Sequence, residues 1–288
     1  MARSPSEFEQ TEEPSIVASV FITGSSDGLG RRAAQRLVTM GHDVVLHGRD
    51  QHRAREAMRT VPGARTALVG DLASIQETHA LAEQANAAGP FQTVIHNAGI
   101  QLIHNAGVYR PNASRPETVD GLEETFAVNT LAPYLLTALI ARPQRLVFLT
   151  SGLHRNGQPD LGDVQWRQRR WSGSQAYSNS KLFVVALALG VARRWPYVLS
   201  NAVDPGWVST KMGGPHAPDD FEQGAETQVW LAVSDEPAAL VSGQYVYHKR
   251  VRAAHPAAAD VDFQNQLLDA CAQLTGVPLS PAVAPISP

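Results

Sequence analysis

Short apolar runs alternate along the chain with longer segments in which apolar residues recur at helical spacing. The apolar runs are predicted as strands, at residues 17–23, 43–47, 65–69, a stretch within 93–104, 145–150, 199–203 and 244–247. The longer segments are predicted as helices, at residues 29–40, 52–60, 74–88, 120–141, 174–194 and 222–233. This alternation predicts a doubly wound α/β fold, a parallel sheet of about seven strands with helices on both faces.

The two ends of the chain depart from this pattern. Residues 1–14 are polar and acidic, which predicts a disordered tail rather than a secretion signal. Residues 15–254 hold the alternating pattern without interruption and are expected to form a single domain. Residues 255–288 are rich in Ala and Pro and are predicted to be a partly helical extension, with one amphipathic stretch at 261–274.

Composition narrows the classes of partner. The net charge of −3 and the lack of dense Lys or Arg runs argue against a nucleic-acid or anionic-lipid partner. The longest apolar run, residues 182–192, is about half of the ~20 residues that a membrane-spanning helix needs. Cys271 is the only cysteine, so no internal disulfide can form, and no zinc-ligand pattern is present. We therefore expect a cytoplasmic protein without a metal.

A glycine-rich turn follows the first predicted strand, in Thr23-Gly24-Ser25-Ser26-Asp27-Gly28-Leu29-Gly30. Glycine permits positive φ and lets backbone N–H groups approach a pyrophosphate at the N-terminus of a helix. The G-x₃-G-x-G spacing differs from the G-x-G-x-x-G fingerprint, and no Gly-Lys-Ser/Thr follows, so a triphosphate-binding P-loop is disfavoured. Taken alone, the turn could also be a tight strand-to-helix connection.

Tyr177 and Lys181 lie one helical turn apart, in Tyr177-Ser178-Asn179-Ser180-Lys181. In a helix, positions i and i+4 share a face, which brings the Lys181 ammonium near the Tyr177 phenol. A positive charge favours the phenolate, so we expect the pKa of Tyr177 to fall from ~10 towards neutrality. Such a phenol can exchange a proton with an alcohol or a ketone. Alone, this spacing is also typical of an exposed helical pair.

Together, the turn and the Tyr-x₃-Lys helix resemble the short-chain dehydrogenase/reductase family over residues 17–247. The resemblance implies a Rossmann-type fold, a nicotinamide cofactor and a small-molecule carbonyl or alcohol as substrate. The separation of Ser151 from Tyr177 is longer than is common in the family, which makes residues 152–173 an insertion. This arrangement resembles the branch that contains the retinol dehydrogenases.

The resemblance implies a catalytic set of four residues: Asn129, Ser151, Tyr177 and Lys181. Ser151 would hydrogen-bond the substrate oxygen, and Tyr177 would donate or accept the proton. Lys181 would lower the tyrosine pKa and hold the cofactor ribose, and Asn129 would hold the lysine through water. Taken singly, Ser151 could instead cap a strand, and Asn129 could be a satisfied polar residue in a helix.

The same resemblance implies the cofactor contacts. Asp71 would meet the adenine, although it could also be a turn former. The Val208 backbone and the Thr210 hydroxyl would contact the nicotinamide. The implied cofactor-binding residues are Gly24, Ser26, Gly28, Leu29, Gly30, Arg49, Asp71, Leu72, Asn97, Ala98, Gly99, Tyr177, Lys181, Pro205, Gly206, Val208 and Thr210.

The end of the second predicted strand bears on the choice of cofactor. An NAD enzyme usually has an acid there, which binds the ribose hydroxyls and repels a 2′-phosphate. Here Gly48 takes that place and Arg49 follows, and a guanidinium can pair with a phosphate. NADP is therefore preferred, and NAD stays possible. Asp27 and Asp50 weaken the positive field, and Arg49 could be a solvated loop residue.

The pentapeptide Ile-His-Asn-Ala-Gly occurs twice, at residues 95–99 and 103–107. If the first copy ends the strand, the connection from the preceding helix is four residues long, within the usual range. If the second copy ended it, thirteen residues would loop out and expose several large apolar side chains. We therefore assign the strand to the first copy, which puts Asn97, Ala98 and Gly99 against the cofactor. The loop that follows then carries eight extra residues.

These observations predict an NADP-dependent oxidoreductase that interconverts a carbonyl and an alcohol. Trp166, Trp171, Trp207, Met212 and Phe221 fall in predicted loops over the site. They favour an apolar or aromatic substrate, although the same residues could simply pack these loops onto the body.

The sequence leaves two other function classes to consider. A cofactor-sensing binding module with vestigial chemistry is the main alternative. A hydrolase is disfavoured because no acid–base–nucleophile pattern surrounds His154, near Ser151, and because the Gly-x-Ser-x-Gly nucleophile elbow is expected to be missing. For assembly, family members commonly pair through the helices that begin near Asp120 and Ser174, so a homodimer or homotetramer is expected.

Overall fold

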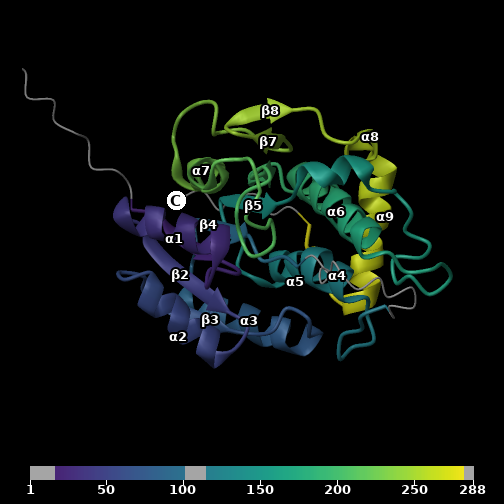
Figure 1. The fold of residues 1–288 in the computed structure, drawn as a ribbon, viewed down its shortest axis with the longest axis horizontal. Helices are drawn as coiled ribbons and strands as arrows, with labels where there is room; N and C mark the ends of the chain where they lie inside the picture. The colour runs from purple at the N-terminus through teal and green to yellow at the C-terminus, as the bar shows by residue number, and fades with distance from the viewer. Residues whose placement is uncertain (1–16, 101–114, 282–288) are drawn as a thin grey trace, which may run out of the picture.

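One mixed sheet organises the computed structural model, which describes residues 17–100 and 115–281 (Figure 1). In this part of the chain, eight strands are hydrogen-bonded in the order β3-β2-β1-β4-β5-β6-β7-β8. The strands are β1 Ser19–Ile22, β2 Asp43–Gly48, β3 Thr66–Val69, β4 Thr93–His96, β5 Arg145–Leu149, β6 Leu199–Asp204, β7 Tyr245–Tyr247 and β8 Arg250–Arg252. The strand order reverses between β1 and β4, and an open parallel sheet binds ligands at such a switch point.

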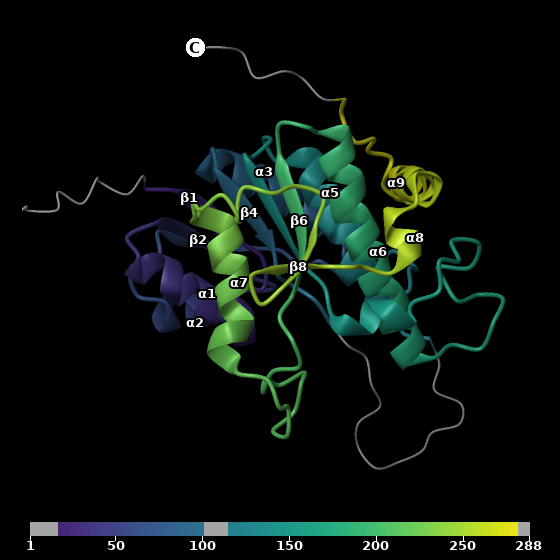
Figure 2. The same ribbon diagram turned by 90° about the horizontal axis from the view of Figure 1, so that it is seen from above.

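Helices cover both faces of the sheet, as Figure 2 shows from above. One face carries α1 Gly28–Thr39, α2 Gln51–Thr60 and α7 Phe221–Val233. The opposite face carries α3 Ile75–Ala88, α5 Ala132–Leu139 and α6 Gly173–Arg194. The shorter helices are α4 Glu124–Phe126, the π-helix η1 Ala127–Leu131, the 3₁₀-helix η2 Gly152–Asn156 and α8 Pro256–Ala259. The predicted doubly wound α/β architecture is confirmed.

The strand in the repeated segment is the first copy, as predicted. Thr93–His96 pairs in parallel with β1 and β5, through Val94 with Phe21 and Val94 with Leu146. The second copy lies in residues 103–107, outside the described residues. The predicted tail at 1–14 lies outside them as well.

Two elements differ from the expectation. The sheet has an eighth strand, β8, which pairs antiparallel with β7. Its three residues are all exposed and two are Arg, so no apolar pattern marks it in the sequence. The helix predicted over 120–141 is instead divided into α4, η1 and α5. Pro133 lacks a backbone N–H and cannot complete a regular α-helical ladder at the junction, which accounts for the change of pitch.

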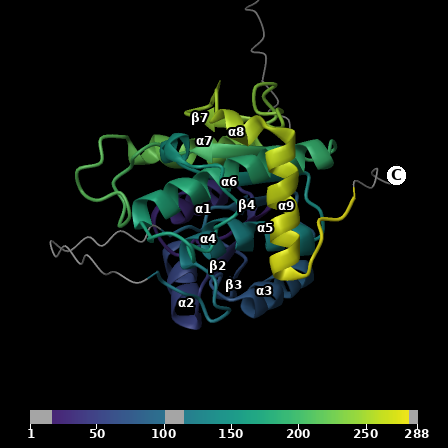
Figure 3. The ribbon, with the colours of Figure 1, turned by 90° about the vertical axis from the view of Figure 1, so that its right-hand side faces the viewer.

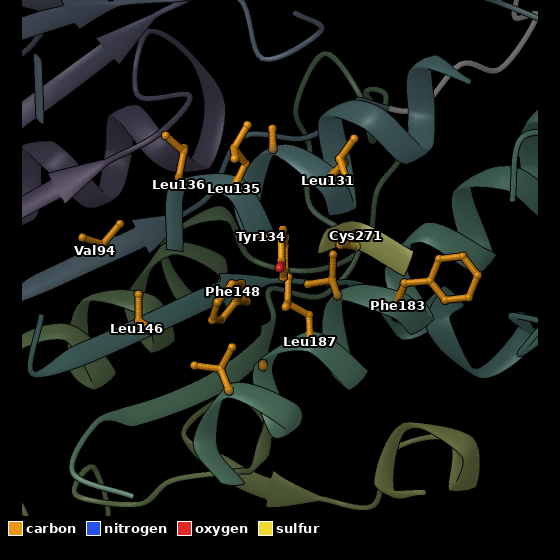
Figure 4. Close-up of a cluster of buried hydrophobic side chains, with 14 of the residues drawn as sticks. Val94, Leu131, Tyr134, Leu135, Leu136, Leu146, Phe148, Phe183, Leu187 and Cys271 are labelled. Carbon is orange, nitrogen blue, oxygen red and sulfur yellow. The ribbon is translucent and has the colours of Figure 1, made fainter. Parts of the chain in front are cut away.

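The C-terminal helix α9, Val261–Thr275, forms an additional outer layer on one side of the molecule. Figures 1 and 3 show it against α6 and α5. Leu267, Leu268 and Cys271 are fully or almost fully buried there. Figure 4 shows Cys271 in one apolar cluster with Tyr134 and Leu187. Helix α6 is therefore covered by the sheet on its inner side and by α9 on its outer side.

The segment after α9 continues this cover. The Tyr134 hydroxyl donates to the Val277 carbonyl at 2.8 Å, and the Trp195 indole N–H donates to the Ser280 carbonyl at 2.8 Å. The Arg142 guanidinium lies 4.3 Å from the Trp195 ring and donates to the Pro281 carbonyl. The C-terminal extension is thus bound to the body along its described length. Among the helices of residues 17–100 and 115–281, none is long and apolar enough to span a membrane.

Candidate active site

A cleft of about 1120 Å³ lies at the carboxyl ends of the central strands. Its walls are the turn after β1, the segments after β4 and β5, helix α6 and the loop after β6. Of the predicted site residues, those that line it are Gly24, Ser26, Gly28, Leu29, Arg49, Asp71, Leu72, Asn97, Ala98, Gly99, Ser151, Tyr177, Lys181, Pro205, Gly206, Val208 and Thr210. Gly30 and Asn129 lie behind this lining. The predicted residues therefore converge on one cavity from segments far apart in the sequence.

The glycine-rich turn is packed too tightly for side chains. Gly24 has φ +64°, and a Cβ there would lie 2.8 Å from the Ala98 Cα. A Cβ at Gly30 would lie 2.3 Å from Asn97 Nδ2, and this amide donates to the carbonyls of Thr23 and Gly24 at 3.1 Å each. The absence of a side chain at Gly30 therefore lets the start of α1 pack closely against the end of β4. The turn keeps backbone atoms beside the cleft, where N–H groups at the N-terminus of α1 could bind an anion.

His47 is hydrogen-bonded to the same glycine-rich turn, and it was not among the predicted site residues. Its Nδ1 accepts from the Gly24 N–H at 2.9 Å, and its Nε2–H donates to the Gly70 carbonyl at 2.8 Å. The ring is 3% exposed, and burial lowers the pKa of His47. A neutral ring with the proton on Nε2 satisfies both contacts. A buried histidine at the end of an apolar strand was the available signal.

The expectation that the Gly-x-Ser-x-Gly pattern of hydrolase nucleophiles is missing is wrong, because residues Gly24 to Gly28 fit it. In that class a histidine must accept the hydrogen of the central serine, here Ser26. Within the described ranges, no histidine side chain is hydrogen-bonded to Ser26. Among the residues that the structure describes, none is therefore the base that would activate Ser26.

Tyr177 and Lys181 are both buried on α6, on the side that faces the end of β5. The Lys181 Nζ lies 5.6 Å from the centre of the Tyr177 ring and donates to the Leu149 carbonyl at 3.0 Å. Burial lowers the pKa of Lys181 to about 8, while the charge of Asp204 acts to raise it.

The predicted fall in the Tyr177 pKa is wrong for this structure. Burial raises the pKa of Tyr177 to about 12; a hydrogen bond with Ser151 lowers it, and the charge of Asp204 raises it further. The expectation considered only the lysine charge. It omitted the loss of water around a hydroxyl that is enclosed by protein, and a carboxylate that the sequence analysis did not place near it.

Asn129 sits in η1 with its amide fully engaged. Its Oδ1 accepts from the Ile100 N–H and its Nδ2 donates to the Ile100 carbonyl, both at 2.8 Å. Nδ2 also donates to the Ser180 hydroxyl at 3.0 Å. Asn129 thus links the end of β4 to α6, next to Lys181. A Cβ on Gly99 would lie 3.2 Å from Lys181 Nζ and 3.4 Å from Asn129 Oδ1, so a side chain there would be in tight contact with both groups.

Asp204, at the end of β6, also lines the cleft and was not among the predicted site residues. Its Oδ2 accepts from the Tyr245 hydroxyl at 2.6 Å, and its Oδ1 accepts from the Gly206 N–H at 3.0 Å. His154 lies beside this pair, with its ring centre 4.5 Å from that of Tyr245. Tyr245 and His154 come from segments distant from Asp204, so no local motif indicates them.

His154 connects the cleft to the C-terminal extension. Its Nε2 accepts from the His255 N–H at 3.2 Å, so its Nδ1–H donates to the Ser151 carbonyl at 2.8 Å. Both ring nitrogens are therefore used in backbone contacts, and burial lowers the pKa of His154. The histidine has a structural role here, as the absence of a triad pattern suggested.

The loop after β6 closes the cleft opposite the glycine-rich turn. Trp207 and Met212 line the cavity, whereas Trp166, Trp171 and Phe221 are not part of its lining, which corrects the prediction that all five lie over the site. Trp166 is instead 7% exposed, packed under the Arg169 guanidinium. Lys211 forms an ion pair with Asp27, which joins this loop to the N-cap of α1.

Comparison with known proteins agrees with this geometry. Residues 18–159 match the family model described as short chain dehydrogenase. The chain is 44% identical to the uncharacterized oxidoreductase AN7799 of Emericella nidulans, over 90% of this chain and 97% of the relative. It is 34% identical to the putative daunorubicin C-13 ketoreductase DnrU of a Streptomyces species, over 90% of this chain and 92% of the relative.

Two more distant matches extend the picture. Human retinol dehydrogenase 13 is 29% identical over 90% of this chain and 85% of its own length, so the resemblance to the retinol dehydrogenase branch holds at a distance. A crystal structure of a putative uncharacterized protein from Mycobacterium paratuberculosis superposes with a TM-score of 0.78 at 26% identity. It covers 93% of this chain and 97% of that one.

Proposed function

Because the chain belongs to the short-chain dehydrogenase/reductase family, we propose that it is an NADP-dependent oxidoreductase that interconverts a carbonyl and an alcohol on an apolar or aromatic small molecule. The observation that carries the proposal is the convergence of Ser151, Tyr177 and Lys181 on the cleft that the glycine-rich turn borders. An oxidised or reduced nicotinamide supplies the hydride chemistry when it is bound.

The residues present fit such a cofactor. The turn after β1 has no side chain between Gly24 and Ala98, and α1 begins at Gly28 beside the cleft. Asn97, Ala98 and Gly99 continue the same wall. Asn97 Oδ1 is buried and lacks a hydrogen-bond partner among the described residues. The small side chains of this wall leave room for a flat ligand group, and the Asn97 Oδ1 could accept a hydrogen bond from it.

In this proposal, different residues of the chain transfer the proton, orient the substrate oxygen and hold these groups in place. The Tyr177 hydroxyl is placed to give its proton to a carbonyl oxygen, or to take one from an alcohol as the phenolate. The Ser151 hydroxyl lines the same cleft as Tyr177 and would orient the same oxygen. Lys181 holds a positive charge behind Tyr177, fixed by its bond to the Leu149 carbonyl. Asn129 keeps the end of β4 in place beside that lysine.

The end of β2 supports NADP over NAD. A Cβ at Gly48 would lie 2.4 Å from the Ala54 backbone nitrogen, so the acid that an NAD enzyme uses cannot be accommodated there. Arg49, the next residue, lines the cleft with its side chain 68% exposed, and Arg53 lines it as well. Asp50 lies 3.6 Å from Arg49 and competes for its charge.

The mouth of the cleft supports an apolar substrate. Leu153, Trp207 and Met212 line the cavity and are 42%, 59% and 45% exposed. Large apolar side chains gathered around one opening mark a surface that binds apolar ligands. All three come from loops at the carboxyl ends of β5 and β6, next to Ser151 and Tyr177.

Cofactor oxidation tests the proposal directly. We expect NADPH absorbance to fall when the protein is mixed with members of a panel of aldehydes, ketones and quinones, faster than with NADH. Tyr177→Phe is the matched control, because it keeps the ring and removes the proton. Binding of NADPH without turnover of any compound in a broad panel would contradict the enzymatic proposal and favour a cofactor sensor.

The structure also bears on the predicted homodimer or homotetramer. Pairing through α5 and α6 needs an open apolar face on these helices, yet α9 and residues 276–281 lie on it. We propose that this face does not pair two copies of the chain. Chemical cross-linking at micromolar concentration is expected to give no product that joins two copies of α6. A stable dimer with chemical cross-links between two copies of α6 would contradict this.

A further inference from the structure

Asp204 is a buried carboxylate that the family resemblance does not assign to the reaction. It is 5% exposed at the carboxyl end of β6. The Tyr245 hydroxyl and the Gly206 N–H hold one oxygen each, at 2.6 and 3.0 Å. Burial, followed by the charge of Asp204, raises the pKa of Tyr245, so its hydroxyl stays a donor. Two fixed donors give the carboxylate a single orientation.

This carboxylate lies close to the catalytic residues proposed above. A Cβ on Gly152, the residue after Ser151, would lie 3.2 Å from Asp204 Oδ2. Asp204, Tyr177 and Lys181 line the same cleft. The glycine at 152 therefore leaves the space through which the carboxylate borders the site.

The charge of Asp204 has no direct counter-ion in the part of the chain that the structure describes: no Lys, Arg or His nitrogen lies within 4 Å of it. The titratable groups around it are Lys181 and Tyr177 on α6, His154 on η2, and Tyr245 and Tyr247 on β7. Arg155 lies behind Tyr245, 5.5 Å from its ring. Lys181 and Tyr177 are the two that also take part in the proposed reaction.

Elementary electrostatics fixes the direction of each effect. A negative charge stabilises a nearby ammonium and destabilises a nearby phenolate, and both effects are stronger where water is excluded. The charge of Asp204 acts with these signs: it raises the pKa of Tyr177, and it raises the pKa of Lys181 against the larger lowering by burial. Asp204 thus opposes the effect of Lys181 on the tyrosine while it keeps Lys181 charged.

We propose that Asp204, oriented by Tyr245, is a positioning residue that keeps Tyr177 in its proton-donating form into the alkaline range, and so extends carbonyl reduction to high pH. The inference rests on the proposed function. In the reduction, the carbonyl carbon takes a hydride from the reduced nicotinamide and the oxygen takes the Tyr177 proton. Solvent then returns a proton to the phenolate. Alcohol oxidation needs that phenolate, so Asp204 confines oxidation to still higher pH.

Asp204→Asn tests this, because the amide keeps the size of the side chain: its oxygen can still accept from the Gly206 N–H, and its NH2 can donate to the Tyr245 oxygen. We expect the alkaline limb of kcat/KM for reduction, and the acid limb for oxidation, to move together to lower pH. At an effective dielectric constant of about 20, a unit charge within about 12 Å is worth about one pH unit or more. Unmoved limbs would overturn the proposal.

Tyr245→Phe is the matched control, since it removes the donor and keeps the carboxylate. Its limbs are expected to move less than half as far. Equal shifts in both variants would show that packing, rather than charge, is responsible, and would overturn the proposal. Asp204→Ser provides a second neutral side chain if the asparagine variant fails to fold.

A direct titration separates this inference from the proposed function. With ¹³C-labelled tyrosine and Tyr177→Phe for assignment, NMR reports the Tyr177 phenol in the free protein. We expect its pKa to fall in Asp204→Asn. If it falls while neither protein reduces any carbonyl, the coupling stands and the proposed reaction fails. If it does not fall, the coupling is refuted whatever the activity.

Discussion

The two sides of the cleft are built in opposite ways. The side formed by β1, α1 and β4 depends on side chains that are absent, since a Cβ at Gly24 or Gly30 would lie within 3 Å of neighbouring atoms. The side formed by β5, α6 and β6 depends on side chains that are present and buried, among them Tyr177, Lys181 and Asp204. The first side is therefore damaged by adding atoms, and the second by removing them.

The largest effect is expected on the second side, from Tyr177→Phe. Loss of the hydroxyl removes the proton donor, which contributes about 10²–10⁴ in rate, so we expect kcat to fall by about 10³. The ring stays in place, and the dissociation constant for NADPH, measured by fluorescence titration, is expected to change less than about twofold. Reduction near the wild-type rate would refute the role of Tyr177.

On the first side, Gly30→Ala adds one methyl group. That carbon would lie 2.3 Å from Asn97 Nδ2 and 2.4 Å from the Gly24 carbonyl oxygen, so backbone must shift. We expect stability to fall by about 1–3 kcal/mol, as in overpacked cores, and NADPH affinity to fall at least about tenfold. Thermal unfolding and titration measure the two effects.

Gly41→Ala is the control for this glycine. Gly41 has φ +85° but nothing within 4 Å of a new Cβ, so the variant has backbone strain without a clash. It should lose about 1–2 kcal/mol and bind NADPH as the wild type does. If both variants bind the cofactor normally, the close packing of the turn is not what shapes that side of the site.

Arg49 follows β2 at the edge of the cleft, and its substitution is expected to have a smaller effect that is selective for one cofactor. Arg49→Ala removes the guanidinium that would pair with the 2′-phosphate, and we expect the Michaelis constant for NADPH to rise about tenfold. The constant for NADH is expected to stay within about twofold. An equal rise for both cofactors would refute the assignment of Arg49.

The smallest effect concerns stability and Lys181. Because its pKa in the folded protein is lowered to about 8 from 10.5, the unfolded chain binds more protons between these values, and stability rises with pH across that window. Lys181→Met lacks this proton. Its advantage in melting temperature over the wild type is therefore expected to shrink from about pH 7 to about pH 10.

Lys211→Met, at a side chain that is 77% exposed, is the control, and its difference from the wild type is expected to stay constant. A pH-independent difference for Lys181→Met would mean that the ammonium is not penalised by burial. Burying the charged Lys181 side chain on the second side of the cleft would then not lower the free energy of unfolding.

The same contrast explains what could be predicted from the sequence. The glycine-rich turn was visible because missing side chains leave a local pattern at residues 24–30, and the register of β4 followed from loop length. Tyr177 and Lys181 were visible because they lie one helical turn apart. Asp204 and Tyr245 were not, because 41 residues separate them and only the pairing of β6 with β7 brings them together.

Local sequence patterns also did not predict how deeply individual side chains are buried. The Tyr177 pKa was predicted with the wrong sign because the phenol is enclosed by α6, the end of β5 and the loop after β6. His47 was missed because its role lies in two backbone contacts, to Gly24 and Gly70, that form only when β1, β2 and β3 are assembled. β8 was missed because an exposed, charged strand has no apolar side to reveal it.

The outer layer formed by α9 has a consequence for synthesis of the protein. Chains emerge from the ribosome with their N-terminus first, so α6 and its apolar outer side are made well before the residues that cover them. Until Val261–Thr275 has been translated, Leu182 to Val191 have no partner on that side. A message that stops early would leave the outer side of the longest helix of the described chain uncovered, even though every residue of the cleft had been made.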